Sequence, residues 1–187
     1  MRLSIFSRLV LTSLVIIAVM GGVNLYALFQ LRQLTAMSTQ MASYHYPAVE
    51  SAKRLLGSLY AQQNNEKKFL ATKDPTFRTN VTEEVEEFQR VLHVLRGQES
   101  STRGLTFLQE TGELLKERER LFDSAFQVAT RSIHPAISDY ESKRDSLTDR
   151  MSFTLQNYID LHEARVSVGV TESRASAAQA EAVTEQL

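Results

Sequence analysis

The chain has 187 residues, of which 23% are charged, and a formal net charge of −1. This balance excludes the strongly basic surface that collects nucleic acid, so no nucleic-acid partner is expected. The absence of cysteine excludes a disulfide scaffold and a thiolate metal site. Only 7 glycines and 3 prolines occur, against an average usage of roughly 7% and 5%. Few turn-forming residues indicate few turns, and therefore long helices.

The first predicted element is a membrane-spanning helix at residues 9–31, which carry no charged side chain. About 20 apolar residues are enough to cross the hydrocarbon core of a bilayer. Arg2 and Arg8 precede this segment without an acidic residue, so residues 1–8 are expected in the cytoplasm and residues 32–187 outside it. A cleaved secretory signal is the alternative. Because no A-x-A-like cleavage site follows and the segment is long for a signal, an uncleaved anchor is favoured.

The next predicted helix carries apolar positions at an average spacing of 3.5 residues, the heptad period of left-handed helix packing. These positions are Leu31, Leu34, Met37, Met41, His45, Ala48, Ala52, Leu55 and Leu59. Pro47 is expected to kink or break this helix locally. Asp74-Pro75 is expected to end it, because the residue before a proline avoids the helical region.

Three further helices follow, separated by breaks at residues 96–104 and 132–135. The second begins at Pro75, which is favourable at a first helical position, and has apolar positions Phe77, Val81, Val85, Phe88, Leu92 and Leu95. The third has Leu105, Leu108, Gly112, Leu115, Glu119, Phe122, Phe126, Ala129 and Ile133. The fourth runs unbroken to Leu187 along Ile137, Tyr140, Arg144, Leu147, Met151, Leu155, Tyr158 and Leu161.

Every predicted element is a helix, so the predicted fold is all-α. Helices joined by short loops pack antiparallel. We expect an up-down-up-down four-helix bundle with long stalk helices, preceded by a transmembrane helix. The domains are therefore residues 1–8 (cytoplasmic), 9–31 (membrane) and 32–187 (extracytoplasmic bundle with stalk). Matching helix lengths leaves about 20 residues of stalk, ~30 Å, and returns the last helix to the membrane. A second span is expected just beyond Leu187, which would make this chain the N-terminal part of a larger receptor.

Polar residues interrupt the apolar stripes at one level near the distal tip of the predicted bundle. They are Gln62 and Glu66 on the first bundle helix and Arg144 on the fourth. A buried charge needs partners, so the favoured interpretation is an internal Glu66–Arg144 ion pair that fixes helix register. Alternatively, Arg144 with Glu66 and Gln62 binds a small anionic ligand, since a guanidinium suits carboxylate or phosphate. A third possibility is that these side chains reach solvent. Glu119 would lie at the lower edge of this layer.

No catalytic motif, cofactor motif or metal-ligand spacing stands out, so the chain as given is not expected to be an enzyme. His45, His93 and His134 fall at different levels, which argues against a metal site, and His45 is expected to line the core. The segment Leu161–Arg165 is superficially similar to the phosphoacceptor box of histidine kinases. The proline that follows in that box is absent, so His162 is expected to be a solvated helix histidine.

The anchor, the segment "HYPAVESAKRLLGSLYAQQNNEKKFLATKDPTF" and the heptad-patterned bundle resemble the extracytoplasmic four-helix-bundle sensor region of bacterial sensor histidine kinases, and more loosely of methyl-accepting chemotaxis receptors. The most specific part runs from Tyr46-Pro47 to Asp74-Pro75. The resemblance implies a homodimeric two-component input module in the bacterial inner membrane, mostly periplasmic, that relays signal by helix displacement. It implies no particular ligand; a small anion or a periplasmic protein is expected. A chemotaxis sensor region and a membrane-tethered structural coiled-coil protein are the alternatives.

Overall fold

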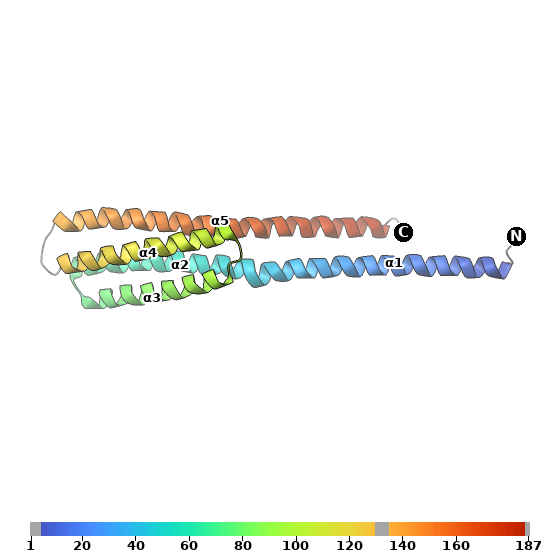
Figure 1. Cartoon of the computed structure of the whole chain (residues 1–187), viewed down its shortest axis with the longest axis horizontal. Helices are drawn as coiled ribbons and strands as arrows, with labels where there is room; N and C mark the ends of the chain where they lie inside the picture. Colours follow the sequence, from blue (N-terminus) through green and yellow to red (C-terminus); the bar gives the residue numbers. More distant parts are fainter. Residues whose placement is uncertain (1–4, 130–134, 186–187) are drawn as a thin grey trace. The chain divides into compact units, whose positions relative to one another are not determined.

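The structure is a computed structural model of the whole chain and describes residues 5–129 and 135–185. Within these ranges the chain is helical apart from short connections and contains no strand, which confirms the all-α prediction. Figure 1 shows the helices, which are α1 (Ile5–Gln40), the π-helical turn η1 (Met41–His45), α2 (Tyr46–Thr72), α3 (Pro75–Gln98), α4 (Thr102–Ala129) and α5 (Pro135–Glu185). The chain forms two compact units, residues 1–43 with 166–187 and residues 44–165, which are described separately.

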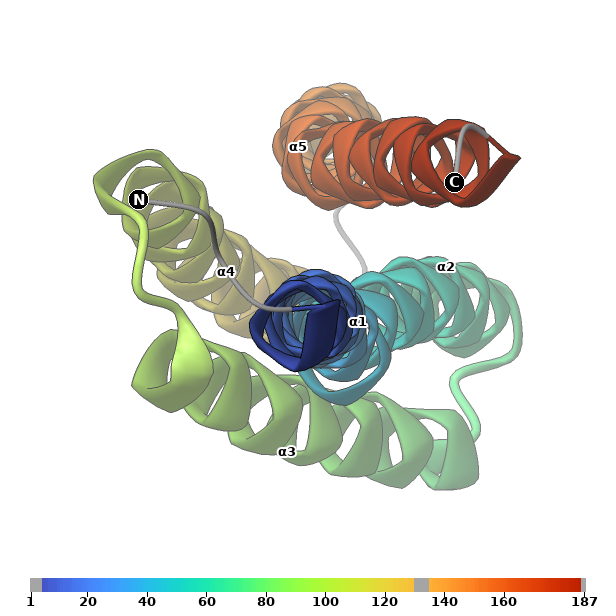
Figure 2. The same cartoon turned by 90° about the vertical axis from the view of Figure 1, so that its right-hand side faces the viewer.

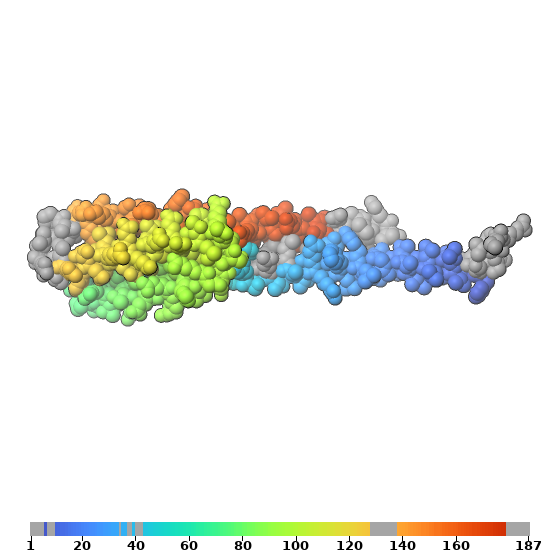
Figure 3. All heavy atoms as spheres, in the orientation of Figure 1, coloured from blue at the N-terminus to red at the C-terminus, as the bar shows by residue number. Residues whose placement is uncertain are grey.

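Residues 44–165 form the helical bundle. In it α2, α3, α4 and the first part of α5 lie side by side, as Figures 1 and 2 show from two directions. A large apolar cluster includes Leu55, Leu59, Phe88, Leu108, Met151 and Leu155. A second cluster, made of Phe69, Val81, Phe122, Ala125 and Tyr140, lies toward the α2–α3 connection. Packed side chains of α3 and α4 close over one face of the bundle (Figure 3).

The α2–α3 connection forms at the predicted Asp74-Pro75 break. Lys73 adopts the left-handed conformation (φ 59°) and its N–H bonds to the carbonyl of Phe69, which caps the end of α2. Asp74 then caps α3, because its carboxylate accepts the N–H of Thr76 at 2.9 Å. Pro75 occupies the first turn of α3, where no N–H is needed. Two adjacent capping devices therefore reverse the chain with only residues 73 and 74.

Pro47 disturbs the backbone where the sequence predicts a disturbance, without interrupting the run of helical residues. The π-helical turn η1 ends at His45, two residues before Pro47. Proline has no N–H, and its ring collides with the carbonyl four residues earlier in a regular α-helix. A wider π-helical turn at this point relieves that collision.

The α3–α4 connection is shorter than the predicted loop of residues 96–104, because α3 continues to Gln98 and α4 begins at Thr102. Near the end of α3, Nη2 of Arg96 donates to the carbonyl of Leu108 on α4 at 2.7 Å. At the other side, the hydroxyl of Ser101 accepts the N–H of Gly104 at 3.1 Å and caps α4. The predicted loop was too long, because Gly97 and Gly104, near its two ends, both lie inside helices.

The last predicted break, residues 132–135, lies outside the described residues except for Pro135, which begins α5. Helix α5 then runs without interruption to Glu185, as predicted. Ile133, His134, Leu187 and the side chains of Leu34, Met37, Met41, Ala129 and Ile137 also lie outside the described residues.

The predicted apolar stripes match the buried residues of α2 and α5 closely. Positions 45, 48, 52, 55, 59, 62, 66 and 69 of the first stripe are all buried, and so are Tyr140, Arg144, Leu147, Met151, Leu155 and Tyr158 of the last. Leu105 was assigned wrongly and is 40% exposed. It lies in the first turn of α4, where few neighbouring side chains are available to cover it.

Residues 10–33 of α1 form a helix apolar enough to cross a membrane, with a mean hydropathy of 2.0. This range overlaps the predicted span at residues 9–31. Its large side chains, Leu31 among them, are exposed in the structure. A long, exposed apolar helix is unfavourable in water and favourable in lipid. Among the described residues this is the one helix with these properties, and it supports membrane association of the chain.

Candidate functional site

The interrupted apolar stripes meet inside the bundle at a buried polar core, defined here as Gln62 and Glu66 of α2, Arg118 of α4, and Tyr140 and Arg144 of α5. All five residues are buried. The structure therefore brings the three predicted site residues to one level, and the possibility that they reach solvent is wrong. It also adds Arg118 and Tyr140, which the sequence analysis did not assign to a polar site.

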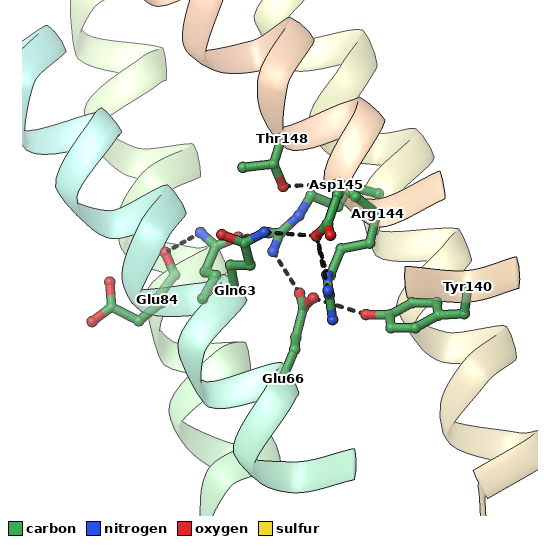
Figure 4. Close-up of polar contacts among 9 residues, drawn as sticks. Gln63, Glu66, Glu84, Tyr140, Arg144, Asp145 and Thr148 are labelled. Atoms are coloured by element: carbon green, nitrogen blue, oxygen red, sulfur yellow. Dashed lines mark hydrogen bonds and ion pairs between the residues drawn. The ribbon is translucent and has the colours of Figure 1, made fainter. Parts of the chain in front are cut away.

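Glu66 pairs with Arg118 and not with Arg144, which corrects the predicted ion pair. Nη2 of Arg118 lies 2.8 Å from Oε1 of Glu66. The other carboxylate oxygen, Oε2, accepts the hydroxyl of Tyr140 at 2.8 Å, as Figure 4 shows. Nη1 of Arg118 donates to the side-chain oxygen of Gln62. Arg118 thus holds both polar residues of α2 at once.

Arg144 bonds to its own neighbour in sequence. Its Nε and Nη2 donate to Oδ1 of Asp145 at 2.9 and 2.8 Å (Figure 4). The same oxygen accepts Nε2 of Gln63 on α2 at 2.8 Å. The half-exposed carboxylate of Asp145 can keep part of its hydration while it neutralises the buried guanidinium. This local partner explains why Arg144 does not need Glu66.

Arg118 was missed because two periodic assignments compete on α4. Leu115 and Phe122 are seven residues apart, and either Arg118 or Glu119 fits between them at helical spacing. The sequence analysis chose Glu119, which is partly exposed and accepts Nε2 of Gln89 at 2.6 Å. Charge complementarity with Glu66 was the one signal that favours Arg118, since a buried carboxylate needs a cation.

Burial raises the pKa of Glu66, and the charges of Arg118 and Arg144 and the Tyr140 hydroxyl oppose that rise without cancelling it. Burial beside this carboxylate also raises the pKa of Tyr140. When Glu66 is ionised, two guanidinium groups pair with the carboxylates of Glu66 and Asp145. The charges therefore balance inside the bundle, which fits a role in fixing how α2, α4 and α5 pack.

Two guanidinium donors of the polar core are left over. Nε of Arg118 and Nη1 of Arg144 are buried without a hydrogen-bond partner among the described residues. A pocket of about 170 Å³ adjoins Arg118, with Gln62, Glu66, Arg78, Val81, Thr82, Val85, Leu115, Glu119, Phe122 and Asp123 as its other lining residues. Arg144 does not line this pocket. A buried donor without a partner is costly, so a small polar guest in the pocket that satisfied Nε of Arg118 would be stabilised.

A second polar group, the histidine cluster, lies at the opposite end of the bundle. His162 is completely buried, which corrects the expectation of a solvated helix histidine. Its Nε2 lies 2.9 Å from Oε2 of Glu99, and its Nδ1 lies 2.9 Å from Nδ1 of His45. The rings of Tyr44 and Tyr158 pack against His162 at centroid distances of 5.6 and 4.5 Å. His45 is buried as well, as predicted.

The surroundings in the histidine cluster favour the ionised form of its acidic member and the neutral form of its histidines. Burial raises the pKa of Glu99, but hydrogen bonds from the Ser101 N–H and hydroxyl and from His162 outweigh it and lower that pKa to about 2. Burial lowers the pKa of His162, and the nearby Glu99 only partly compensates. Burial, then His162 and Arg165, lower the pKa of His45. The Tyr158 hydroxyl faces Glu99 without completing a hydrogen bond of ordinary geometry.

Over the described ranges, no group of three or more histidine, aspartate or glutamate side chains is arranged to hold a metal ion. In the histidine cluster, the two Nδ1 atoms face each other and Glu99 lies on the far nitrogen of His162. The three side chains therefore do not converge on one point.

Comparison of the chain with protein-family models, curated proteins and solved structures finds no match.

Proposed function

We propose that this chain is the sensory input module of a bacterial transmembrane receptor, a two-component sensor histidine kinase, with its anchor in the inner membrane and its bundle in the periplasm. The observation that carries this proposal is the extent of α5. This helix supplies one side of the bundle up to Arg165 and continues unbroken to Glu185. A helix without a break transmits a small displacement along its length, because packed helices have discrete arrangements.

The contacts between α2 and α5 suit a displacement of this kind. Side-chain bonds join Lys53 to Glu163 at 3.1 Å, Gln63 to Asp145 at 2.8 Å, and Glu66 to Tyr140 at 2.8 Å. Hydrogen bonds depend steeply on distance and angle. A relative shift of about 1–2 Å, typical of switching helices, would therefore break one set of bonds and permit another.

A homodimer is part of this proposal. Tyr60 on α2 and Phe153 on α5 are large apolar side chains that are 53% and 69% exposed. Burying such side chains against a second copy would recover hydrophobic free energy. Anchoring in a membrane raises the local concentration, so a weak interface would be sufficient.

For the stimulus, we propose a small anion at the polar core. The free donors on Arg118 and Arg144 support this assignment. An internal ion pair that only fixes helix register is the competing explanation, and the variants of Arg118 and Arg144 in the Discussion separate the two. A periplasmic protein is the second kind of partner that the proposed location would allow.

The proposal is tested by a chimera in which this chain is joined, through α5, to the second span and kinase domain of a characterised receptor. Insertion of one to four residues after Arg165 would rotate the end of α5 by about 100° per residue. We expect kinase output to vary periodically with the number of inserted residues. Output that is independent of these insertions would refute signalling through α5.

The gene that follows codon 187 separates this proposal from its two alternatives. A second span followed by kinase motifs supports a histidine kinase, whereas a second span followed by a long signalling coiled coil supports a chemotaxis receptor. A stop codon would favour a membrane-tethered structural coiled-coil protein and would overturn the sensor assignment.

A further inference from the structure

We propose that His45 and His162 form a proton-binding site that separates α2 from α5 at this end of the bundle when it takes up two protons from mildly acidic surroundings. Proton uptake depends on the geometry of the histidine cluster alone. Its consequence for signalling rests on the proposed sensor function.

The hydrogen bonds define which nitrogens carry hydrogen. Nε2 of His162 faces the carboxylate of Glu99 at 2.9 Å, so this nitrogen donates. In neutral His162 the other nitrogen, Nδ1, is then an acceptor. Nδ1 of His45, 2.9 Å away, must therefore carry a hydrogen and donate it to His162. One tautomer of each ring satisfies the whole arrangement.

While its two rings stay bonded to each other, the pair can hold one extra proton but not two. A first proton from solvent adds to the free Nε2 of His45, and the Nδ1–H···Nδ1 bond survives. A second proton must add to Nδ1 of His162, because its Nε2 already carries hydrogen. Two N–H groups and two positive charges would then face each other across 2.9 Å. The bond between the rings is lost, and both imidazolium rings gain free energy by reaching water.

The surroundings disfavour even the singly charged pair. His162 is completely buried, and His45 is buried as well. The groups that face the pair are Glu99, Tyr44, Tyr158 and Arg165. Only Glu99 favours a cation here, and Arg165 opposes it. Glu99, with a pKa of about 2, and the two tyrosines, with raised pKa values, do not titrate between pH 5 and 7.

The pair ties two helices at the end of the bundle. His45 is the last residue of η1, directly before α2, and His162 lies on α5 three residues before the bundle unit ends at Arg165. Between α2 and α5 at this level, the other side-chain bond given by the structure is the exposed Lys53–Glu163 ion pair. An exposed pair contributes little, so loss of the histidine contact removes the main polar tie at this end and leaves the apolar packing of Ala48, Ala52 and Ile159.

Linkage makes the expected pH dependence steep. An open state with hydrated histidines takes up two protons below the ordinary pKa of about 6.5, whereas the closed state takes up none until lower pH. Each proton changes the closed-to-open ratio about tenfold per pH unit. The ratio should therefore fall up to about 100-fold for each pH unit between roughly 6.5 and 5.

The experiment measures the α2–α5 distance in the full chain, reconstituted in phosphatidylcholine–phosphatidylglycerol nanodiscs with a chelator present. The chain has no cysteine, so spin labels attach only at the exposed introduced pair Glu50→Cys and Ala164→Cys. A second pair, Lys67→Cys and Glu141→Cys, reports the opposite end of the same helices. We expect a longer distance to appear at the first pair from pH 7.5 to 5.0 and no change at the second. A constant distance at the first pair, or an equal change at both, would overturn the proposal.

Variants assign the two protons. His45→Asn and His162→Gln each leave one titrating ring, so the change per pH unit should drop to about tenfold, and the double variant should show none. His93→Gln removes an exposed histidine on α3 and should retain the full dependence. A full dependence in the double variant would refute the assignment.

Ring titration by NMR in the unmodified chain keeps the test independent of variant folding. Midpoints below 6.5 for His45 and His162 support the site, and midpoints at or above 6.5 contradict it. A repeat of the distance measurement with Zn²⁺ in place of the chelator completes the test: distances that respond to Zn²⁺ and not to pH would contradict the proposal, because the two Nδ1 atoms would then serve a metal. None of these outcomes bears on the insertion series in the chimera, so failure of the proton site and failure of the sensor function are distinguishable.

Discussion

Arg118 on α4 and Glu66 on α2 form an ion pair at 2.8 Å, with their side chains only 3% and 1% exposed. Both charges have lost their hydration, so the pair contributes little compared with well-packed apolar residues. Removal of one partner is destabilising, because the other charge stays buried without compensation. The pair therefore restricts which helices can pack together more than it raises the free energy of unfolding.

The variant Arg118→Met tests this relationship. It leaves the Glu66 carboxylate buried beside Tyr140 and should lower the free energy of unfolding by roughly 3–5 kcal/mol. The double variant Glu66→Gln with Arg118→Met should recover most of that loss, because no uncompensated charge remains. Denaturant unfolding of the full chain in detergent gives both values. Arg120→Met, at an exposed position on the same helix, is the control and should differ little from the unmodified chain. An additive double variant would show that the two side chains are not coupled.

Arg144 should be less critical for stability than Arg118. Its partner Asp145 is half exposed and can be hydrated again when the guanidinium is removed. The change also removes the unpartnered Nη1 donor. We therefore expect Arg144→Met to cost roughly 1–2 kcal/mol, less than Arg118→Met in the same assay. A loss as large as that of Arg118→Met would mean that Glu66 depends on both arginines equally.

The same variant tests the proposed anion. Phosphate and succinate should raise the melting temperature of the unmodified chain if they bind the folded state, and Arg144→Met should abolish that rise. Arg150→Met, an exposed position on α5, should preserve it. No rise with either anion in the unmodified chain would favour the purely structural explanation of the polar core.

The sequence predicts the helices well because heptad spacing and proline depend on local geometry. The stripe from Ala48 to Phe69 and the stop at Asp74-Pro75 both belong to this class. The partner of Glu66 could not be predicted with the same accuracy, because Arg118 and Glu119 fit the periodicity of α4 equally. His162 was misplaced for a related reason. Leu161 and His162 both fit the helical spacing after Tyr158, and the stripe was assigned to Leu161, which is partly exposed, whereas His162 is the buried residue.

Gly104 should not tolerate a side chain, because an added Cβ would lie against the Glu99 carboxyl group and the Ser101 hydroxyl. Neither neighbour can move freely, since Glu99 bonds to His162 and Ser101 caps α4. We expect Gly104→Ala to lower the melting temperature. Gly57→Ala in α2 is the matched control, with no atom near the added Cβ, and alanine should stabilise the helix there by roughly 0.5–1 kcal/mol. Equal melting temperatures for the two variants would contradict the close packing around Glu99.

The proposed orientation in the membrane rests on the positive charges that precede the apolar helix. A reporter enzyme that is active only in the periplasm should work when fused after Leu187, because the chain has one helix among its described residues that can cross the membrane. The same reporter fused after Arg8 should be inactive. A reporter active only in the cytoplasm should give the reverse pattern. Cytoplasmic activity at Leu187 would refute the proposed orientation.

Glu99 should control stability in acid, in a pH window separate from that of the histidines. Hydrogen bonds to its carboxylate overcome the effect of burial and lower its pKa from 4.5 to about 2. A lowered pKa means that the unfolded chain binds the proton more readily, so this contribution is complete above about pH 4.5 and is lost as pH falls toward 2. The shift corresponds to about 3 kcal/mol.

The variant Glu99→Gln cannot titrate at this position, so its free energy of unfolding should fall by about 3 kcal/mol less than that of the unmodified chain between pH 5 and pH 2. Two other carboxylates also have lowered pKa values. A hydrogen bond with Thr76 lowers the pKa of Asp74, and hydrogen bonds with Arg144 and Gln63 outweigh burial and lower that of Asp145. Both contribute equally to the two chains and cancel in the difference. Denaturant unfolding at each pH provides the comparison. Glu86→Gln, exposed on α3, should follow the unmodified chain. Parallel curves for Glu99→Gln and the unmodified chain would show that the Ser101 hydrogen bonds, which remain after the histidine pair has opened, do not hold this carboxylate ionised.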